Sequence, residues 1–193
     1  ANEVYLHGKL RDGRSFMSIA QHTGGFGGSA RQDGPSTLCF PFNTRNIPVE
    51  VIENEARVYY VRKEFVPDTG GPGYNRGGLG QVVEFCILDG GTPEAHHVES
   101  SVRISGRVET GVMPAFGRCG GGVGRGGGLW LNDKPVEHGV YRKLAPADRV
   151  RFVMTGGGGY GDPFERESER VAEDVRAGKV TVAAAKRDYG VAI

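Results

Sequence analysis

The sequence lacks any segment suited to cross a bilayer and any excess of charge of one sign. No run approaches the ~20 apolar residues that a membrane-spanning helix needs, and the chain does not begin with a basic stretch followed by an apolar run. Its 24 lysines and arginines are spread along the chain and balanced by 23 aspartates and glutamates. These absences predict a soluble protein with no membrane and no nucleic-acid partner.

Cysteine is also scarce. Cys39, Cys86 and Cys119 lie far apart and form no C-x-x-C pair, which argues against a disulfide framework or a zinc site. We therefore expect reduced thiols in a cytoplasmic protein. The chain begins at Ala1, directly with a strand-like pattern, so we expect processing, an artificial boundary or a further upstream region.

Self-sufficient catalytic motifs are missing as well. We find no phosphate-binding P-loop, no H-E-x-x-H helix and no G-x-S-x-G nucleophile elbow. The neighbouring His96 and His97 would point to opposite faces of a strand, so a shared metal is not expected. Surface or packing roles are assigned to them and to the isolated His7, His22 and His138. The sequence thus predicts no metal ligand, and its catalytic residues are unknown.

Glycine, in contrast, is abundant: 33 of 193 residues is more than twice the average usage of ~7%. The glycines gather at residues 24–28, 70–80, 120–128 and 156–161, each beside a strand-like segment. This pattern predicts tight, closely packed loops between strands.

The strand-like segments have high β-branched and aromatic content. A first hairpin is predicted from residues 4–7 and 15–19 around Asp12-Gly13, and a second around residues 132–135. Further strands are predicted at residues 57–66, 81–88, 101–108, 128–131 and 150–154.

The end of the chain has the pattern of two short helices. Ser168 is the predicted cap of the first helix, and Gly178 suits its left-handed C-terminal position. Thr181 is the predicted cap of the second, which Gly190 ends. Their predicted buried faces contain Val171, Ala172, Val175, Val182, Ala185 and Tyr189.

These patterns predict a mainly β, α+β fold. We expect a layered β domain with glycine-rich loops over residues 1–163, on which a helical hairpin of residues 164–193 packs. An additional helix within residues 25–56 is compatible with the sequence.

A polar segment stands out within residues 43–53. Its amide, guanidinium and carboxylate groups belong to Asn43, Arg45, Asn46, Glu50 and Glu53. Because Glu50 alternates with two valines, one interpretation is an ordinary half-exposed strand. The other is an Arg45/Glu50/Glu53 network that supports a neighbouring site or subunit.

Two glycine-rich loops are candidate binding elements. The first, residues 67–80, contains Asp68, Gly70, Gly71, Arg76, Gly77 and Gly78. Its backbone could approach a partner closely, with Arg76 available for an anion or carboxylate, or it could be a rigid connection between strands. The second contains Gly156, Gly157, Gly158, Gly159 and Asp162. Its amides could hold an anion, or the loop could simply lead into the closing helices.

Four motifs in this order carry a resemblance to a known family. They are the Gly-Gly-Phe-Gly run at Gly24 followed by Asp33-Gly34, then residues 43–53, 68–80 and 155–163, the last continuing into two small helices that end at Tyr189-Gly190-Val191. The sequence resembles the C-terminal part of hydantoinase B, which is shared with 5-oxoprolinase and the large subunits of acetone and acetophenone carboxylases.

The resemblance implies a multi-subunit enzyme. In that family an A-type partner binds ATP with magnesium and phosphorylates an amide or carbonyl oxygen, and the B-type subunit handles the activated intermediate. The family's metal-binding residues lie upstream of the region represented here, and we find no matching cluster. We therefore expect no cofactor bound by this chain itself, a divalent metal in the upstream B-type region and, as partners, the A-type subunit and possibly the N-terminal B-type portion as a separate chain.

Three functional hypotheses follow from the resemblance. The leading one is a component of an ATP-dependent hydrolase of cyclic amides, in which Asn46, Glu50 and the loop around Arg76 support the site from outside the metal shell. The alternatives are a subunit of an acetone- or acetophenone-type carboxylase, in which the activated species are an enol phosphate and carboxyphosphate, and a non-catalytic assembly module.

Overall fold

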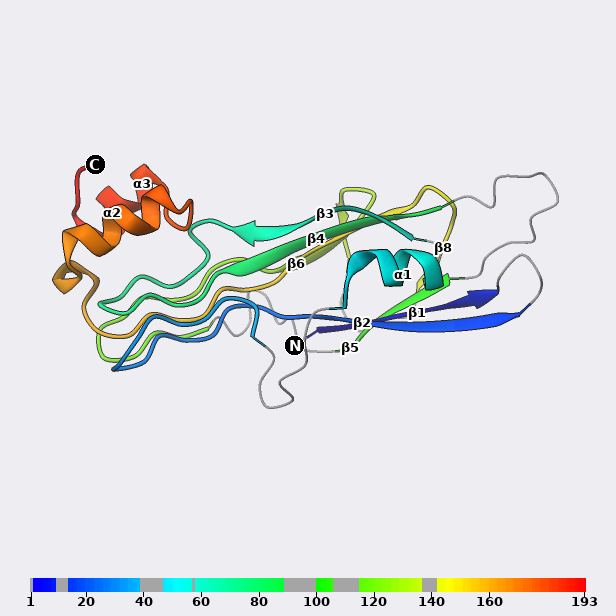
Figure 1. Ribbon diagram of the computed structural model, residues 1–193, viewed down its shortest axis with the longest axis horizontal. Helices are drawn as coiled ribbons and strands as arrows, with labels where there is room; N and C mark the ends of the chain where they lie inside the picture. Colours follow the sequence, from blue (N-terminus) through cyan, green and yellow to red (C-terminus); the bar gives the residue numbers. More distant parts are fainter. Residues whose placement is uncertain are drawn as a thin grey trace.

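The computed structural model describes residues 2–9, 14–38, 47–56, 58–88, 100–105, 115–136 and 142–193 (Figure 1). The strands are β1 (Asn2–Lys9), β2 (Ser15–His22), β3 (Val58–Val66), β4 (Gly80–Ile87), β5 (Ser100–Ser105), β6 (Gly128–Leu131), β7 (Lys134–Pro135), β8 (Arg142–Leu144) and β9 (Arg149–Val153). The helices are α1 (Val49–Ala56), the short 3-10 helix η1 (Pro163–Glu165), α2 (Ser168–Arg176) and α3 (Val182–Tyr189).

Two antiparallel sheets form the body of the molecule. One has four strands in the order β2-β1-β5-β8, and the other has five in the order β3-β4-β9-β6-β7. The two predicted hairpins are present: β1 pairs with β2, and β6 pairs with β7. The second turn is shorter than predicted, because only Asn132 and Asp133 form it, and Lys134 and Pro135 are the strand β7. Both turn residues have positive φ angles, of 51° and 60°, as the tightest hairpin turns require. The other predicted strands are present with ends shifted by one or two residues over their described parts.

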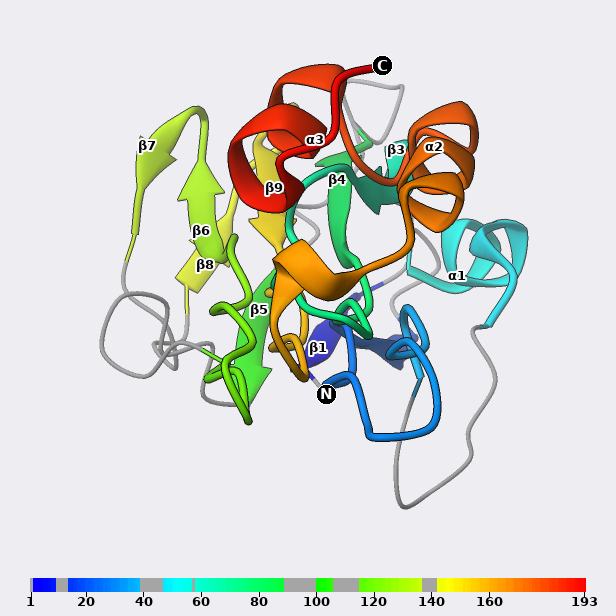
Figure 2. The same ribbon diagram turned by 90° about the vertical axis from the view of Figure 1, so that its left-hand side faces the viewer.

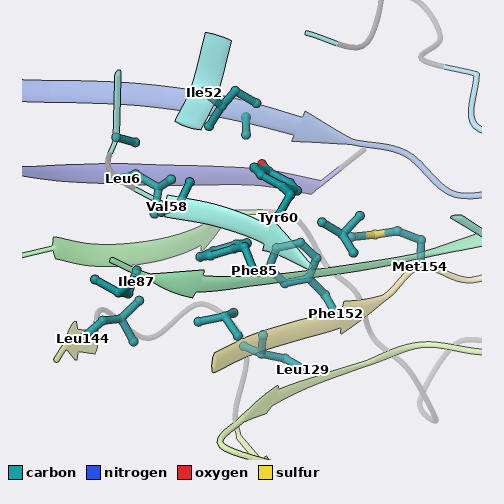
Figure 3. Close-up of a cluster of buried hydrophobic side chains, with 14 residues drawn as sticks. Leu6, Ile52, Val58, Tyr60, Phe85, Ile87, Leu129, Leu144, Phe152 and Met154 are labelled. Carbon is teal, nitrogen blue, oxygen red and sulfur yellow. The ribbon is translucent and has the colours of Figure 1, made fainter. Parts of the chain in front are cut away.

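The two sheets enclose the main hydrophobic core (Figure 3). Alternate residues of β4, Val83, Phe85 and Ile87, face it and are almost fully buried. They meet Leu6 of β1 and Phe152 of β9. Burying each side chain of this size contributes about 1.5–3 kcal/mol, so the sandwich core is the main stabilising element of the sheets.

Helix α1 closes one side of the sandwich, between the edges of β2 and β3 (Figure 1). The strand interpretation of residues 49–51 is therefore wrong, whereas the additional helix within residues 25–56 is confirmed. Ile52 and Ala56, four residues apart, bury the same side of the helix. This packing outweighs the strand preference of the two valines at the start of α1.

The C-terminal helices α2 and α3 lie together at one end of the molecule (Figure 1). Thr181 caps α3 as predicted, because its hydroxyl accepts the N–H of Ala184 at 3.1 Å. Gly178 and Gly190 adopt the predicted left-handed conformation, with φ angles of 67° and 69°. Ser168 is not the cap of α2, since Glu167 occupies that position and Ser168 is the first helical residue.

The architecture confirms the predicted α+β fold with a helical C-terminus. In the described part of the chain, no helix is long and apolar enough to cross a membrane. The division into domains at residue 163 stays a prediction.

Candidate functional site: a glycine bundle and an ion cluster

Beyond the sheets, four glycine-rich segments run side by side toward the end that carries α2 and α3 (Figures 1 and 2). We call residues 24–28, 70–78, 117–124 and 156–161 the glycine bundle. Backbone hydrogen bonds join the segments, including Gly28 N to Gly158 O at 2.8 Å, Gly71 N to Gly157 O at 2.8 Å, Gly157 N to Gly78 O at 2.9 Å and Gly159 N to Gly122 O at 2.9 Å. The last segment therefore contacts each of the other three.

Glycine is required in the bundle because the backbones approach so closely. A β-carbon at Gly77 would overlap the carbonyl oxygen of Gly157, and one at Gly159 would overlap that of Pro72. Neither Gly77 nor Gly159 has a positive φ angle, so at these two positions space rather than backbone conformation excludes a side chain. The prediction of closely packed loops is confirmed.

Most glycine amides of the two candidate loops already donate to backbone oxygens of this chain. Besides the bonds above, Gly77 N donates to Gly71 O at 2.9 Å, Gly78 N to Phe26 O at 2.7 Å and Gly156 N to Arg125 O at 2.8 Å. The predicted close approach of the backbone therefore has its partner within this chain, and these N–H groups already have acceptors that an anion would have to displace.

An ion cluster joins the glycine bundle to the C-terminal helices. We define the cluster as Asp33, Arg76, Arg166, Arg170 and Asp174. Arg166 donates to Asp33 at 2.7 and 2.8 Å and to Asp174 at 2.7 Å. Arg76 donates to Asp174 at 3.1 and 3.3 Å. Arg170 donates to Asp33 at 3.1 Å and lies over the ring of Tyr74, with its guanidinium carbon 5.5 Å from the ring centroid.

The cluster is largely withdrawn from water. The side chains of Arg76, Arg166 and Asp174 are only 2–5% exposed. Burial on its own raises the pKa of Asp33, but hydrogen bonds and charges from Arg166 and Arg76 outweigh burial and hold the pKa below its usual value. Charge pairing of this kind compensates for the loss of hydration. Nearby, burial raises the pKa of the Tyr189 hydroxyl to about 12.

Two candidate residues of the first glycine-rich loop, Arg76 and Asp68, bind the C-terminal helices. The carboxylate expected for Arg76 is Asp174 of α2. Asp68 accepts the backbone N–H of Thr181 at 2.7 Å and its hydroxyl at 2.8 Å, and so holds the start of α3. Asp162 of the second loop accepts the N–H of Phe164 at 2.9 Å and caps η1.

The polar segment of residues 43–53 is only partly described. Asn43, Arg45 and Asn46 lie outside the described residues, so the Arg45/Glu50/Glu53 network stays a prediction. Glu50 is exposed on α1. Glu53 accepts the N–H of Tyr60 at 2.7 Å, which satisfies a donor on the edge strand β3. The structure does not bring Glu50 and Glu53 to Arg76.

Sequence reasoning missed four members of the ion cluster: Asp33, Arg166, Arg170 and Asp174. One signal was present, because Arg166, Arg170 and Asp174 are spaced four residues apart along and just before α2, as on one face of a helix. Asp33, 133 positions from Arg166, carries no comparable local signal.

His22 lies inside the sandwich, so of the two roles predicted for it, surface or packing, it has the packing one. Its ring is fully buried and lies 5.4 Å from that of Phe152, between centroids. Burial, aided by the charge of Lys63, lowers its pKa to about 3. Neither ring nitrogen has a hydrogen-bond partner among the described residues, so the imidazole is neutral.

Reactive groups do not converge in the described ranges of the chain. There, no group of three histidine, cysteine, aspartate or glutamate side chains could hold a metal ion. Cys86 and Cys119 are free thiols. The site therefore consists of a closely packed backbone bundle and an ion cluster that holds the C-terminal helices against it.

The chain is similar in sequence to subunits of two enzymes. The B subunit assigned to a D-/L-hydantoinase of Pseudomonas sp. strain NS671 is 31% identical over 186 residues, covering 92% of this chain and 29% of that protein. The β subunit of the caprolactamase of Pseudomonas jessenii is 30% identical over 190 residues, covering 92% of this chain and 31% of that protein. The chain thus spans about a third of the length of these relatives.

Two solved structures share the fold. Nucleotide-free acetone carboxylase, from work on ATP-dependent acetone carboxylation, superimposes with a TM-score of 0.76 at 19% identity, over 99% of this chain and 29% of that one. The ATP-dependent caprolactamase of Pseudomonas jessenii superimposes with a TM-score of 0.70 at 24% identity, over 99% of this chain and 34% of that one. The model of the hydantoinase B/oxoprolinase family matches residues 1–163, and the chain belongs to this family.

Proposed function

We propose that this chain is a component of an ATP-dependent hydantoinase- or oxoprolinase-type enzyme that hydrolyses a cyclic amide. The observation that carries the proposal is the family match over residues 1–163, together with about 30% identity over nearly the whole chain to subunits named for a hydantoinase and a caprolactamase. In the proposed enzyme, an A-type partner binds ATP with magnesium and activates the amide, and the B-type part completes hydrolysis in the cytoplasm.

The proposed contribution of this chain is to support the site. Since the chain covers about a third of its relatives, a divalent metal and the catalytic residues are assigned to the rest of a B-type subunit, in the same or a separate polypeptide. Asn46, Glu50 and the loop around Arg76 would act from outside the metal shell. The ordered glycine bundle supports this role, because preorganised sites need rigid surroundings.

Purification at endogenous level provides the test. Native mass spectrometry with metal analysis and peptide mapping is expected to find an A-type partner, a B-type metal-containing portion and this chain in one assembly. That assembly should open hydantoin, 5-oxoproline or caprolactam in a reaction that consumes ATP. ATP hydrolysis by this chain alone, or a stable metal-free homo-oligomer without partners, would contradict the proposal; the latter would favour an assembly module.

A carboxylase subunit is the second candidate. The observation behind it is that acetone carboxylase shares the fold over 99% of this chain, as the caprolactamase does, so the fold is compatible with both activities. The same purified assembly distinguishes the two candidates. A copurifying small zinc-containing subunit, with ATP-dependent consumption of bicarbonate and a ketone, would support the carboxylase, whereas ring opening without bicarbonate would support the hydrolase.

A further inference from the structure

The C-terminal helices have a hydrophobic cluster of their own. Its buried members are Val171, Val180, Ala184, Ala185 and Tyr189, with Val175 and Val191 packed against them. All of them belong to residues 164–193, and the cluster shares no residue with the core of the sandwich. In the described part of the chain, α2 and α3 therefore bury apolar surface mainly against each other. We call residues 164–193 the C-terminal hairpin.

The hairpin is joined to the rest of the protein by polar contacts. Arg166 and Asp174 bind Asp33 and Arg76 of the body. At the start of α3, Thr181 is held by both carboxylate oxygens of Asp68. These contacts lie on both helices, so they fix the position of the hairpin as a whole.

An interface of buried charges differs energetically from an apolar one. In the closed position, the charges of Arg76, Arg166 and Asp174 have lost their hydration, which offsets much of their mutual attraction. When the hairpin moves away, water rehydrates all of them, so complete opening costs less than the number of ion pairs suggests. Opening one pair alone is unfavourable, because it leaves a buried charge without its partner. The contacts should therefore open together.

The connection to the bundle suits such a movement. The chain leaves the bundle at Gly161, whose φ angle of 77° is favourable for glycine. Asp162 follows, and its carboxylate caps η1 by accepting the N–H of Phe164, the first residue of the hairpin, at 2.9 Å. This bond, like the apolar cluster, does not depend on the bundle and would persist in an open state.

We propose that the C-terminal hairpin is an ionic clasp that opens from the glycine bundle as a unit while the sandwich stays folded. Opening uncovers a polar face formed by Asp33 together with Asn75 and Arg76 of the bundle. This conformational device goes beyond the proposed enzymatic role and does not depend on it, because it follows from the contacts of this chain alone. Opening of separate units below the free energy of global unfolding is a general property of protein structures.

Hydrogen exchange of the full chain in a series of low urea concentrations tests the proposal. Two amides report the opening, because their hydrogen bonds cross between the hairpin and the body: Asp68 N donates to Lys179 O at 3.1 Å and Thr181 N to Asp68 Oδ1 at 2.7 Å. We expect both to exchange through an opening with a lower free energy and a smaller urea dependence than the amides of β4 and β9. If the two amides exchange with the same free energy and the same urea dependence as β4 and β9, the hairpin does not open independently and the proposal is overturned.

A charge-neutralising pair of variants tests the ionic origin of the opening. Asp174→Asn leaves Arg76 and Arg166 facing a neutral amide and should accelerate exchange of the Asp68 and Thr181 amides about a hundredfold to a thousandfold, the range expected when a buried ion pair loses one charge. Glu173→Gln, one residue away and exposed, is the matched control and should change exchange less than about threefold. Equal effects of the two variants would overturn the ionic clasp. If Asp174→Asn does not fold, the urea series on the unsubstituted chain decides.

Discussion

The backbone of Gly157 lies so close to the carbonyl group of Phe26 that a β-carbon at position 157 would overlap the oxygen. The two residues belong to different segments of the glycine bundle, 131 positions apart in sequence. Gly157 also donates to Gly78 O and accepts from Gly71 N. A single glycine thus holds three segments together without any side chain.

We predict that Gly157→Ala destabilises the protein by more than about 4 kcal/mol, since the added methyl group must displace backbone on both sides. Gly27→Ala is the matched control within the same bundle. A β-carbon there would lie 3.6 Å from Gly158 O, an ordinary contact, and Gly27 has no positive φ angle. The control should change stability by less than about 1 kcal/mol, with stabilisation as the favoured direction. Urea unfolding measures both, and similar losses would mean that close packing is not what requires glycine.

The features that sequence reasoning predicted correctly are those encoded over a few neighbouring residues. Thr181 and Gly190 act within one turn of α3, so their signals did not depend on the rest of the fold. Helix α1 was harder, because the alternation around Glu50 favours a strand and only packing against β2 and β3 selects the helical face of Ile52 and Ala56.

The arrangement of the candidate site was beyond local reasoning for a physical reason. Glycine has no side chain, so a run such as residues 156–159 carries no periodic pattern that indicates which segment it contacts. The pair of Arg76 and Asp174 spans 98 positions. Arg76 could be assigned a carboxylate partner from its chemistry, but the identity of that partner depends on where α2 packs.

Variants of Glu50 and Glu53, both in α1, test which of the two residues stabilises the fold and which supports a neighbouring site. We predict that Glu53→Ala lowers the free energy of unfolding by about 1.5–3 kcal/mol, because the N–H of Tyr60 loses a charged acceptor. Glu50→Ala, at an exposed position, should lower it by less than about 0.5 kcal/mol. Urea unfolding at pH 7 gives both values. If Glu50 supports a neighbouring site as proposed, Glu50→Ala should instead reduce turnover in the purified assembly, and unchanged turnover would remove Glu50 from the candidate site.

Glu84 offers a test of buried charge within the five-stranded sheet. Its side chain is 7% exposed and binds Arg62 at 3.0 Å and Arg149 at 2.7 Å. We predict that Glu84→Gln costs about 2 kcal/mol, below the full value for a buried pair because both arginines are about half exposed. Glu64 binds the same Arg62 at 3.2 Å but is 58% exposed, so Glu64→Gln should cost less than about 0.5 kcal/mol. Thermal unfolding of the two variants side by side checks the difference, and equal costs would show that burial does not govern these pairs.

The neutral state of His22 predicts a specific loss of stability in acid. Burial lowers its pKa from 6.5 to about 3 in the folded protein, so below pH 6.5 the unfolded chain binds a proton that the folded protein does not. The stabilising contribution of neutral His22 is complete above about pH 6.5 and is lost progressively as the pH falls toward 3. Asp33 acts at lower pH: its lowered pKa contributes stability that is lost only as the pH falls below about 4.

We predict that His22→Phe, which keeps a ring against Phe152 and Tyr60, removes the His22 contribution. Between pH 7 and pH 4.5, the unsubstituted protein should lose about 2.5 kcal/mol more than the variant, because other titrating groups contribute equally to both. Urea unfolding of both proteins at the two pH values gives this difference directly. Parallel pH dependences would mean that His22 accepts a proton in the folded state, which would require an acidic partner near a ring that packs here against Phe152 and Tyr60.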